Sequence, residues 1–409
     1  MDLLPDDLLA DVFRRLAPCG LAASRCVRKA WCAIIDTRRL LRADLLPLRL
    51  DGFFCLGRIL HPPPCFFSRR PSPGRQQVAG GLDFLGTRDA MDLHIIDHCN
   101  SLLLLDFGRL VNPATRQWAR LPSSPQQSTG MEDFYDNYGL VYDPMVSPHY
   151  AMFLIPTVPA RLGSSSMFQE DSEWPPSPYS THEHVFSSRS WRWEERSFVL
   201  EGGVAVATIA DMMLTYNRFQ DPIPNTVYLR GALYVHCQDD SVMRINLLND
   251  KFQMIKSPLE SEVVGEDDCA WLLNESCDQT EWALKSNISL QAVVQNYPFS
   301  VQNRYSKPWI VINNNVDMKE ARAEEQFEWN FEDGAILETK DSVETYDQET
   351  FFLGFHPYKE IVFFCLSRAR AVSYHLNSSK VQELGILYDL PDIIKSFPYT
   401  PCWIGELRA

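Results

Sequence analysis

The sequence lacks both the paired cysteines of a disulfide scaffold and the long apolar runs of a membrane protein. Its eleven cysteines are odd in number, scattered over 409 residues, and form no C-x-x-C pair, which argues against a disulfide framework and for a reducing compartment. Apolar runs such as Leu102–Leu105 are far too short to span a bilayer. Charge appears within the first six residues, so no secretory signal is expected. These absences predict a protein of the cytoplasm, the nucleus or both, with no membrane partner.

Motifs of catalysis and cofactor binding are also missing. No Ser or Cys lies in a nucleophile elbow, and no glycine-rich loop could cradle a phosphate. His94, His98 and Cys99 are residue types that bind metals, but a zinc site needs four ligands and no second pair lies nearby in the sequence. We therefore expect no catalytic residue, no cofactor and no metal, and interpret this cluster as structural.

Other polar patterns have simple structural interpretations. His182 and His184 would share one face of a strand, but their Pro- and Ser-rich surroundings favour a surface loop. The acids at Asp239-Asp240 and at 266–268 could bind a cation or act as an acid–base pair, yet carboxylates in turns are usually solvated. The ten tryptophans are interpreted as packing anchors rather than as a sugar-binding platform.

Basic charge is scarce outside the first fifty residues. Residues 1–50 contain nine Lys/Arg and six Asp, a balance of +3, whereas the whole chain has a formal net charge of −15. The other 359 residues therefore carry −18. An acidic body repels phosphate backbones, so nucleic acid is not expected as a partner. The basic N-terminal segment could instead meet an acidic protein surface.

The N-terminal forty residues have the periodicity of short helices. Leu8, Val12 and Leu16 recur every fourth residue, and Leu9 and Phe13 form a neighbouring stripe. We expect a second helix from about Leu21 to Ser24, and a third from about Val27 to Ile35 with Val27, Trp31, Ile34 and Ile35 on one face. Three such helices bury little core alone, so the unit needs either a partner protein or the rest of the chain.

The remainder has the pattern of short strands between turns. A chain of this length, with 27 prolines and 19 glycines, predicts one large domain rich in turns beside the small one. We expect loops at 61–81, a flexible insertion at 169–178 and a solvated acidic loop at 319–349. Predicted strands are Leu102–Leu105, a hairpin at Val227–Val235 around Gly231, Val242–Leu247, Phe351–Phe355, Ile361–Leu366 and Val372–Leu376.

The N-terminal pattern resembles an F-box. The family has an L-P opening, a helix ending in leucine, a second leucine after a break, and R-x-V-x-K-x-W. The matching residues here are Leu4, Pro5, Leu16, Leu21, Arg25, Val27, Lys29 and Trp31. This resemblance implies docking to a Skp-type adaptor and, through it, to a cullin–RING ubiquitin ligase.

The rest of the chain is similar, more loosely, to the F-box-associated β-propeller domains common in plants. The similarity lies in Asn100–Leu105, Asn112–Trp118 and Gly354–Pro357. Family members usually have Asn-Gly where this chain has Asn100-Ser101. The resemblance implies a role in recruiting a protein substrate, whose identity it does not give.

Together these patterns predict a mainly β protein with a small all-α N-terminal domain. The expected parts are a three-helix F-box at 1–45, a linker and connecting segment at 46–89, and a degenerate β-propeller at 90–409. The expected function is that of a non-catalytic substrate receptor; a propeller enzyme, a carbohydrate-binding module and a non-degradative F-box scaffold are alternatives. The expected adaptor-binding residues are Leu4, Pro5, Leu8, Val12, Leu16, Leu21, Val27 and Trp31.

Overall fold

The computed structural model confirms that the protein is mainly β. It describes Leu21, Ser24, Leu40, Leu407 and, apart from single-residue gaps at 79, 145, 160, 230 and 358, residues 5–16, 27–38, 50–57, 64–70, 78–86, 94–125, 133–162, 169–174, 180–201, 207–214, 226–256, 268–275, 280–288, 292–294, 308–312, 335–336, 350–366, 369–387 and 393–402. Among these residues, no helix combines the length and apolarity needed to cross a membrane.

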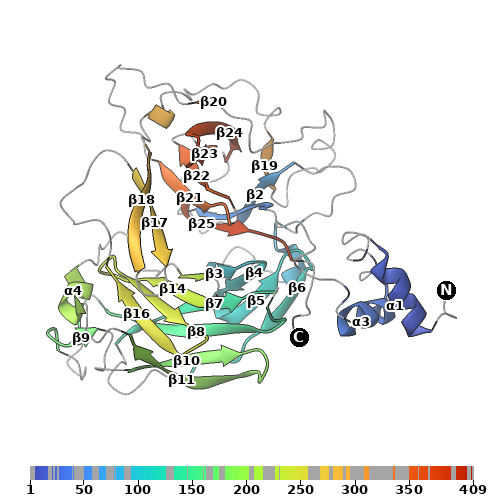
Figure 1. The fold of residues 1–409 in the computed structure, drawn as a ribbon, viewed down its shortest axis with the longest axis horizontal. Helices are drawn as coiled ribbons and strands as arrows, with labels where there is room; N and C mark the ends of the chain where they lie inside the picture. The colour runs from blue at the N-terminus through green and yellow to red at the C-terminus, as the bar shows by residue number, and fades with distance from the viewer. Residues whose placement is uncertain are drawn as a thin grey trace.

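Helices occupy the N-terminal stretch, beside the strands in Figure 1. They are α1 (Asp6–Arg14) and α3 (Lys29–Thr37), and Leu21 and Ser24 between them are also helical. α1 follows Pro5, whose fixed φ suits the start of a helix. Two aspartates in its first turn and an arginine in its last turn complement the helix dipole.

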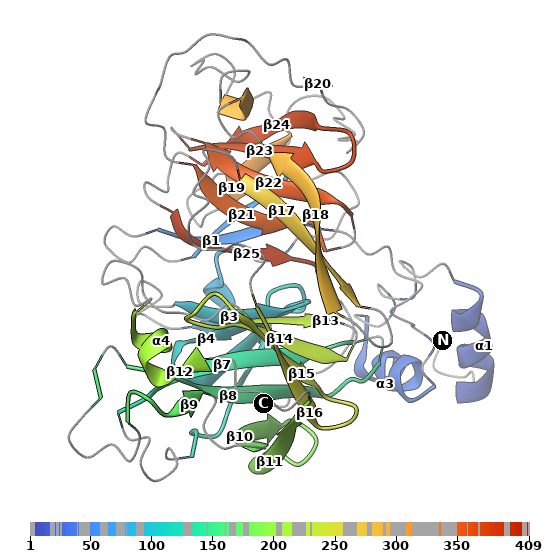
Figure 2. The same ribbon diagram turned by 60° about the vertical axis from the view of Figure 1, so that its left-hand side comes forward.

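The largest sheet has eight strands and nearly closes on itself (Figure 2). Two antiparallel groups of four strands join where β11 runs parallel to β16, and the edge strands β7 and β13 contact each other. The predicted hairpin around Gly231 is confirmed as β13–β14. The strand order is β13 (Thr226–Leu229), β14 (Ala232–His236), β15 (Val242–Asn246), β16 (Lys251–Ile255), β11 (Arg192–Leu200), β10 (Ser180–Ser187), β8 (Tyr150–Thr157) and β7 (Tyr135–Tyr142).

A four-stranded antiparallel sheet lies against this one, because its strand β3 contacts both β7 and β13. Its turn between the third and fourth strands is the predicted Asn-Pro turn, in which Asn112 Oδ1 accepts a hydrogen bond from the backbone N–H of Ala114 at 3.1 Å. The strand order is β3 (Ile95–Cys99), β4 (Leu102–Leu105), β5 (Arg109–Asn112) and β6 (Gln117–Arg120).

Two further sheets form the upper part of Figure 1. One contains β20 (Ala335–Ile336), β24 (Lys380–Ile386), β23 (Arg370–His375), β22 (Ile361–Leu366) and β21 (Phe351–Phe355). The other pairs segments far apart in the sequence, in the order β19 (Trp309–Ile312), β2 (Cys65–Arg69), β1 (Gly52–Gly57) and β25 (Ile393–Tyr399). The smaller elements are the pairs β17 (Asp268–Glu275) with β18 (Thr280–Ile288) and β9 (Glu173–Trp174) with β12 (Ala207–Thr208), the helix α4 (Ile209–Leu214), and 3-10 turns at Asp83–Leu85 and Asp106–Gly108.

Strands β1 and β2 lie in the stretch 46–89, for which the sequence predicted a linker and connecting segment, and β2 lies inside the loop expected at 61–81. Both strands are largely buried. Prolines and arginines cluster on either side of β2, and the partner that stabilises β1 comes from the other end of the chain. The β-rich part therefore begins near Leu50 rather than at residue 90.

The core consists of apolar layers between neighbouring sheets. In β1, Phe53 packs with Trp309 and Phe363 on one side, while Phe54 packs with Phe66 and Tyr399 on the other. Both faces of this sheet are therefore buried. This explains why β1 is a continuous apolar run instead of an alternating one.

Three other expectations have mixed outcomes. The segment of His182 and His184, expected to be a loop, forms β10 because the long strand β11 gives it a regular antiparallel partner. The insertion expected at 169–178 contains β9, and its residues 175–178 lie outside the described part. The acidic segment 319–349 also lies outside it, apart from β20.

Candidate functional site

The N-terminal helices have a small core of their own. Six buried side chains form it, and Trp31 and Leu40 pack against its edge. Trp31 meets Phe13 edge to face at 5.3 Å between ring centroids, and the guanidinium of Arg28 lies 5.6 Å from the Trp31 ring. The helices pack on each other through only some of their apolar side chains, and the others stay outside this core. The core residues are Leu9, Ala10, Phe13, Leu21, Ile34 and Ile35.

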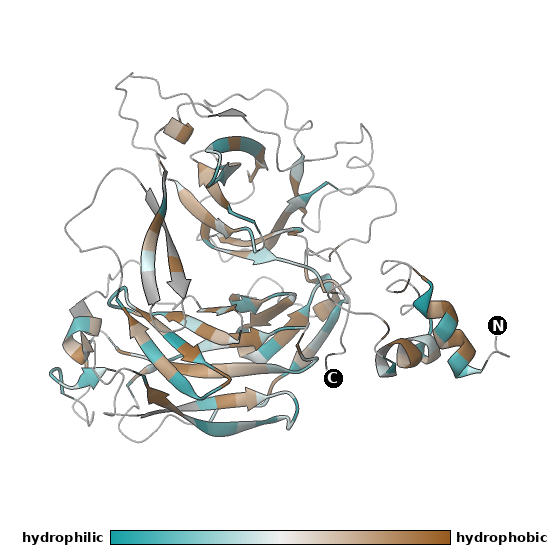
Figure 3. Ribbon diagram, in the orientation of Figure 1, coloured by the Kyte–Doolittle hydropathy of each residue, from teal (hydrophilic) through white to brown (hydrophobic). Residues whose placement is uncertain are grey.

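α1 is rich in apolar residues, which are brown in Figure 3. A second apolar stripe among them is exposed to solvent. Leu8 is 52% exposed and Val12 49%, and both lie one residue away from the buried pair Leu9 and Phe13. Leu16 continues this stripe past the end of the helix and is also exposed. Fully burying such a side chain stabilises by about 1.5–3 kcal/mol, so a contiguous exposed stripe marks a surface that a partner can cover.

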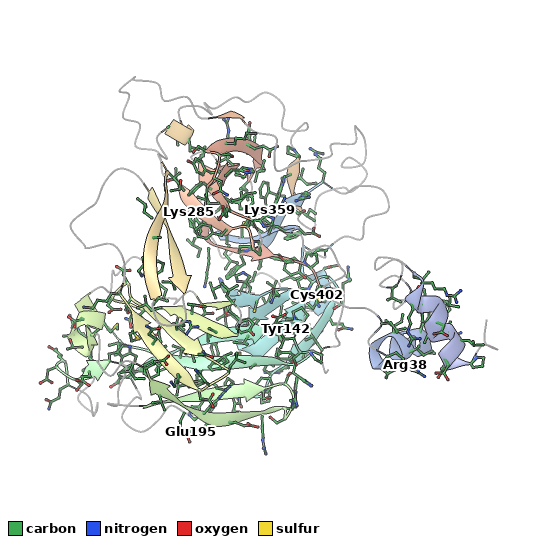
Figure 4. The ribbon with its side chains drawn as sticks, viewed as in Figure 1. Arg38, Tyr142, Glu195, Lys285, Lys359 and Cys402 are labelled. Atoms are coloured by element: carbon green, nitrogen blue, oxygen red, sulfur yellow. The ribbon has the colours of Figure 1, made fainter. Side chains whose placement is uncertain are left out.

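Charged groups border the exposed stripe. Arg38, at the end of α3 in Figure 4, pairs with Asp7 on α1, and Arg14 pairs with Asp11. All four groups are solvent-exposed, so each pair contributes about 0.2–1 kcal/mol at most. Only the Arg38–Asp7 pair joins α1 to α3, and it fixes their relative orientation weakly, so the apolar core holds the two helices together.

The eight residues predicted to bind the adaptor fall into four groups. Pro5, Leu8, Val12, Leu16 and Val27 are exposed, and Val27 is 62% exposed in the turn before α3. Trp31 is partly buried against Phe13, and Leu21 is buried in the helical core. Leu4 lies outside the described residues. Leu21 and Trp31 would therefore act indirectly: their side chains pack in or against the helical core rather than within the exposed stripe.

A second polar cluster lies where the four-stranded sheet of β3 meets the eight-stranded sheet. Asp97 on β3 is buried, and its Oδ2 accepts hydrogen bonds from the backbone N–H of Leu140 at 2.7 Å and from the Thr226 hydroxyl at 2.8 Å. One carboxylate thus joins β3, β7 and β13. Burial raises the pKa of Asp97 to about 6, although these hydrogen bonds and Lys395 oppose the shift.

Of the cluster His94, His98 and Cys99, the last two make contacts with other parts of the protein. Cys99 Sγ lies 3.3 Å from both the backbone N and O of Tyr142, and His98 packs edge-on against Phe397. Lys395 Nζ donates to the carbonyl of Ile96 at 3.1 Å. In the part of the chain that the structure describes, no three His, Cys, Asp or Glu side chains come together to hold a metal.

The Asp97→Asn variant should remove a pH-dependent contribution to stability. The pKa of Asp97 is raised in the folded state, so its favourable contribution is complete below the unfolded pKa of about 3.9 and is lost as pH rises through about 6. The free energy of unfolding of wild type minus that of Asp97→Asn should therefore fall by about 2 kcal/mol between pH 4 and pH 7. Urea titrations at several pH values measure this difference.

Two other titratable groups near Asp97 bear on this test. His98, whose pKa burial lowers to about 4, is present in both proteins, so its titration cancels in the difference. In wild type, Lys395, whose pKa burial lowers to about 8 although Asp97 raises it, stays largely protonated across the range, and Asp97→Asn should lower this pKa further by removing the carboxylate. Parallel stability curves for the two proteins would contradict the raised pKa. Asp239→Asn, in a turn between β14 and β15, is the control.

Comparison with known proteins adds no relative to these observations. No family model matches the chain, and no curated protein matches it. Its function therefore has to be inferred from its own residues.

Proposed function

We propose that this chain is an F-box protein, the substrate-recognition subunit of a Skp–cullin–F-box ubiquitin ligase. Its N-terminal helices would dock a Skp-type adaptor, and its β-rich part would hold a protein substrate. The observation that carries the proposal is the outward-facing stripe of Leu8, Val12 and Leu16 on a helical unit with its own core. Without a partner this stripe leaves a face of α1 in water.

The exposure of the stripe favours docking over internal packing. If Leu8 and Val12 fastened the helices to the β-rich part, their side chains would be buried there, but each is about half exposed. The helical core instead consists of Leu9, Phe13 and their neighbours. A helix with one buried and one exposed apolar stripe suits recognition by a groove on another protein.

The β-rich part is proposed to be a degenerate β-propeller. Four observations support this arrangement: antiparallel groups of four strands, apolar layers between neighbouring sheets, mutual contacts of β3, β7 and β13, and the pairing of β1 with β25. In a propeller the first and last strands close the ring within one blade, and the innermost strands of the blades meet near the axis. The short parallel pairing of β11 with β16 departs from ideal blades.

The proposed mechanism is proximity rather than bond chemistry. A receptor that holds a substrate beside a charged ubiquitin carrier raises the effective concentration of the substrate lysine. The catalytic groups would belong to other subunits, so the chain itself is proposed to be no enzyme and to need no cofactor. Such a complex would work in the cytoplasm, the nucleus or both.

Replacing Leu8 and Val12 with aspartate should abolish co-purification with a Skp-type adaptor. Both side chains are exposed, so the change should leave the helical core intact while placing two charges in the apolar interface. The measurement is pull-down of co-expressed adaptor by the full-length chain, with circular dichroism to compare folding.

Trp31→Ala is unsuitable for this test, because Trp31 packs on Phe13 and its loss would perturb the helical core. The matched control is Val227→Asp/Leu229→Asp, which places two charges on exposed apolar residues of β13. Adaptor binding that survives Leu8→Asp/Val12→Asp, or an intact folded chain that never binds the adaptor, would reject the proposal.

A further inference from the structure

The turn between β4 and β5 holds a phenylalanine in a conformation that suits glycine. Phe107 has φ +61° and ψ +26°, in the left-handed region, and its side chain is 73% exposed. A bulky residue is strained in that conformation. Because the side chain is exposed, it gains little packing energy that could offset this strain. Nothing in the local fold therefore favours phenylalanine over glycine or asparagine at this position.

Two arginines face each other beside this turn. Arg109 on β5 lies directly opposite Arg120 on β6, and like charges in this position destabilise a sheet. In the described part of the chain, no carboxylate forms an ion pair with either guanidinium. The nearest acid along the chain, Asp106, interacts with His94 instead. The β-rich part thus concentrates positive charge here although its overall charge is strongly negative.

An exposed tryptophan lies next to the arginines. Trp118 is 39% exposed and lies two residues before Arg120 on β6, so the two side chains leave the strand on the same face. The turn is close to this strand, because Gly108 accepts a hydrogen bond from the N–H of Leu121 at 2.8 Å. The turn of Phe107 therefore lies beside the face that Arg109, Trp118 and Arg120 share, and these four residues are called here the Phe107 patch.

The patch combines the side chains that dominate protein interfaces. Aromatic residues and arginine are enriched among binding hot spots, and a guanidinium can bind a carboxylate through two hydrogen bonds. Backbone strain and like-charge repulsion lower stability, and no contact among the residues that the structure describes offsets them here. Such costs are expected at residues that serve binding or another function rather than folding. The acidic surroundings would repel an anionic partner elsewhere, so its binding would be confined to this patch.

We propose that the Phe107 patch binds an acidic protein segment that also carries a large apolar side chain. Its Asp or Glu side chains pair with Arg109 and Arg120, and its apolar side chain covers Phe107 and Trp118. This inference rests on the proposed function. It adds the class of target that the receptor would recruit.

The test is a selection of short random peptides displayed on phage, with the full-length chain as bait. Selected peptides should be rich in Asp and Glu next to Leu, Phe or Trp. Fluorescein-labelled copies should lose affinity by about tenfold or more for Phe107→Gly and for Arg120→Glu. Their affinity for wild type should fall as salt is raised. Val146→Gly and Arg189→Glu, exposed residues in two other β-turns, are the matched controls.

Stability separates a binding role from a structural one. Glycine relieves the strain at residue 107, and Arg120→Glu turns repulsion across β5 and β6 into attraction. Both variants should therefore melt at the same temperature as wild type or higher, while losing peptide affinity. Lower melting temperatures, selected peptides without acidic residues, undiminished peptide affinity in both variants, or preferential binding of a single-stranded oligonucleotide would each overturn the proposal.

Failure of this proposal can be told from failure of the proposed function. Peptide binding should persist in Leu8→Asp/Val12→Asp, and adaptor co-purification should persist in Phe107→Gly. Loss of peptide binding by the patch variants together with retained adaptor binding supports both proposals. A chain that binds the adaptor but selects no acidic peptide keeps the receptor proposal and rejects the acidic target.

Discussion

Replacing Gly354 with alanine is expected to lower the free energy of unfolding by about 3–5 kcal/mol. Gly354 lies at an irregular point of β21 with φ +137°, a backbone conformation that L-residues rarely adopt. A Cβ there would also lie 2.7 Å from Cγ of Pro398 on β25, and a proline ring cannot swing aside. Backbone strain and a steric clash therefore add up at one position. Guanidinium chloride denaturation of the full-length chain measures the loss.

Gly86→Ala is the control for this prediction. Gly86 also has a positive φ, +64°, but no atom lies within 4 Å of the position where its Cβ would be. It should therefore show the backbone strain alone, about 1 kcal/mol. Equal losses for the two variants would mean that contact between β21 and β25 does not restrict residue 354.

Asn112→Ala should cost about 2–4 kcal/mol, because one buried side chain makes hydrogen bonds both to its own turn and to the distant C-terminal part of the chain. Its Oδ1 accepts from the backbone N–H groups of Ala114 and Thr115 at 3.1 and 3.4 Å. Its Nδ2 donates to the carbonyl of Cys402 at 3.1 Å. Alanine would leave these groups without that partner in a dry environment. Thermal and urea unfolding should both report the loss.

Asn246→Ala separates the turn from the long-range contact. Asn246 Oδ1 accepts a hydrogen bond from Leu248 N–H at 3.0 Å, the same local turn geometry, on an exposed turn between β15 and β16. Water can replace that bond, so the expected loss is about 0.5–1 kcal/mol. If Asn112→Ala were no worse than Asn246→Ala, the bond to Cys402 would contribute nothing to stability.

Local patterns in the sequence predicted the elements well where the determining residues are neighbours. The turn at Asn112 and the hairpin at Gly231 follow from backbone preferences of single residues, and both are present. The period of Leu8 and Val12 predicted a helix, and α1 is there. It could not say which of the two adjacent stripes is buried, because that depends on where α3 packs.

Long-range pairing was beyond the reach of such patterns. The apolar run of β1 is stable as a strand because β25 pairs with it from the other end of the chain. Likewise, Asn112 was predicted as a turn residue, but its contact with Cys402 depends on the path of the C-terminal residues. Phe107 was overlooked for another reason: only the observed φ and exposure show that this phenylalanine conflicts with its site.

The pairing of β1 with β25 also sets the timing of folding during synthesis. At about 5–20 residues per second, the ribosome needs roughly 20–70 s after making β1 before β25 is complete. During that interval one edge of the apolar strand Gly52–Gly57 has no native partner, and such edges promote aggregation. The N-terminal helices, whose contacts are local, can form early. This protein therefore most needs a chaperone during that interval, while its β-rich part is still incomplete.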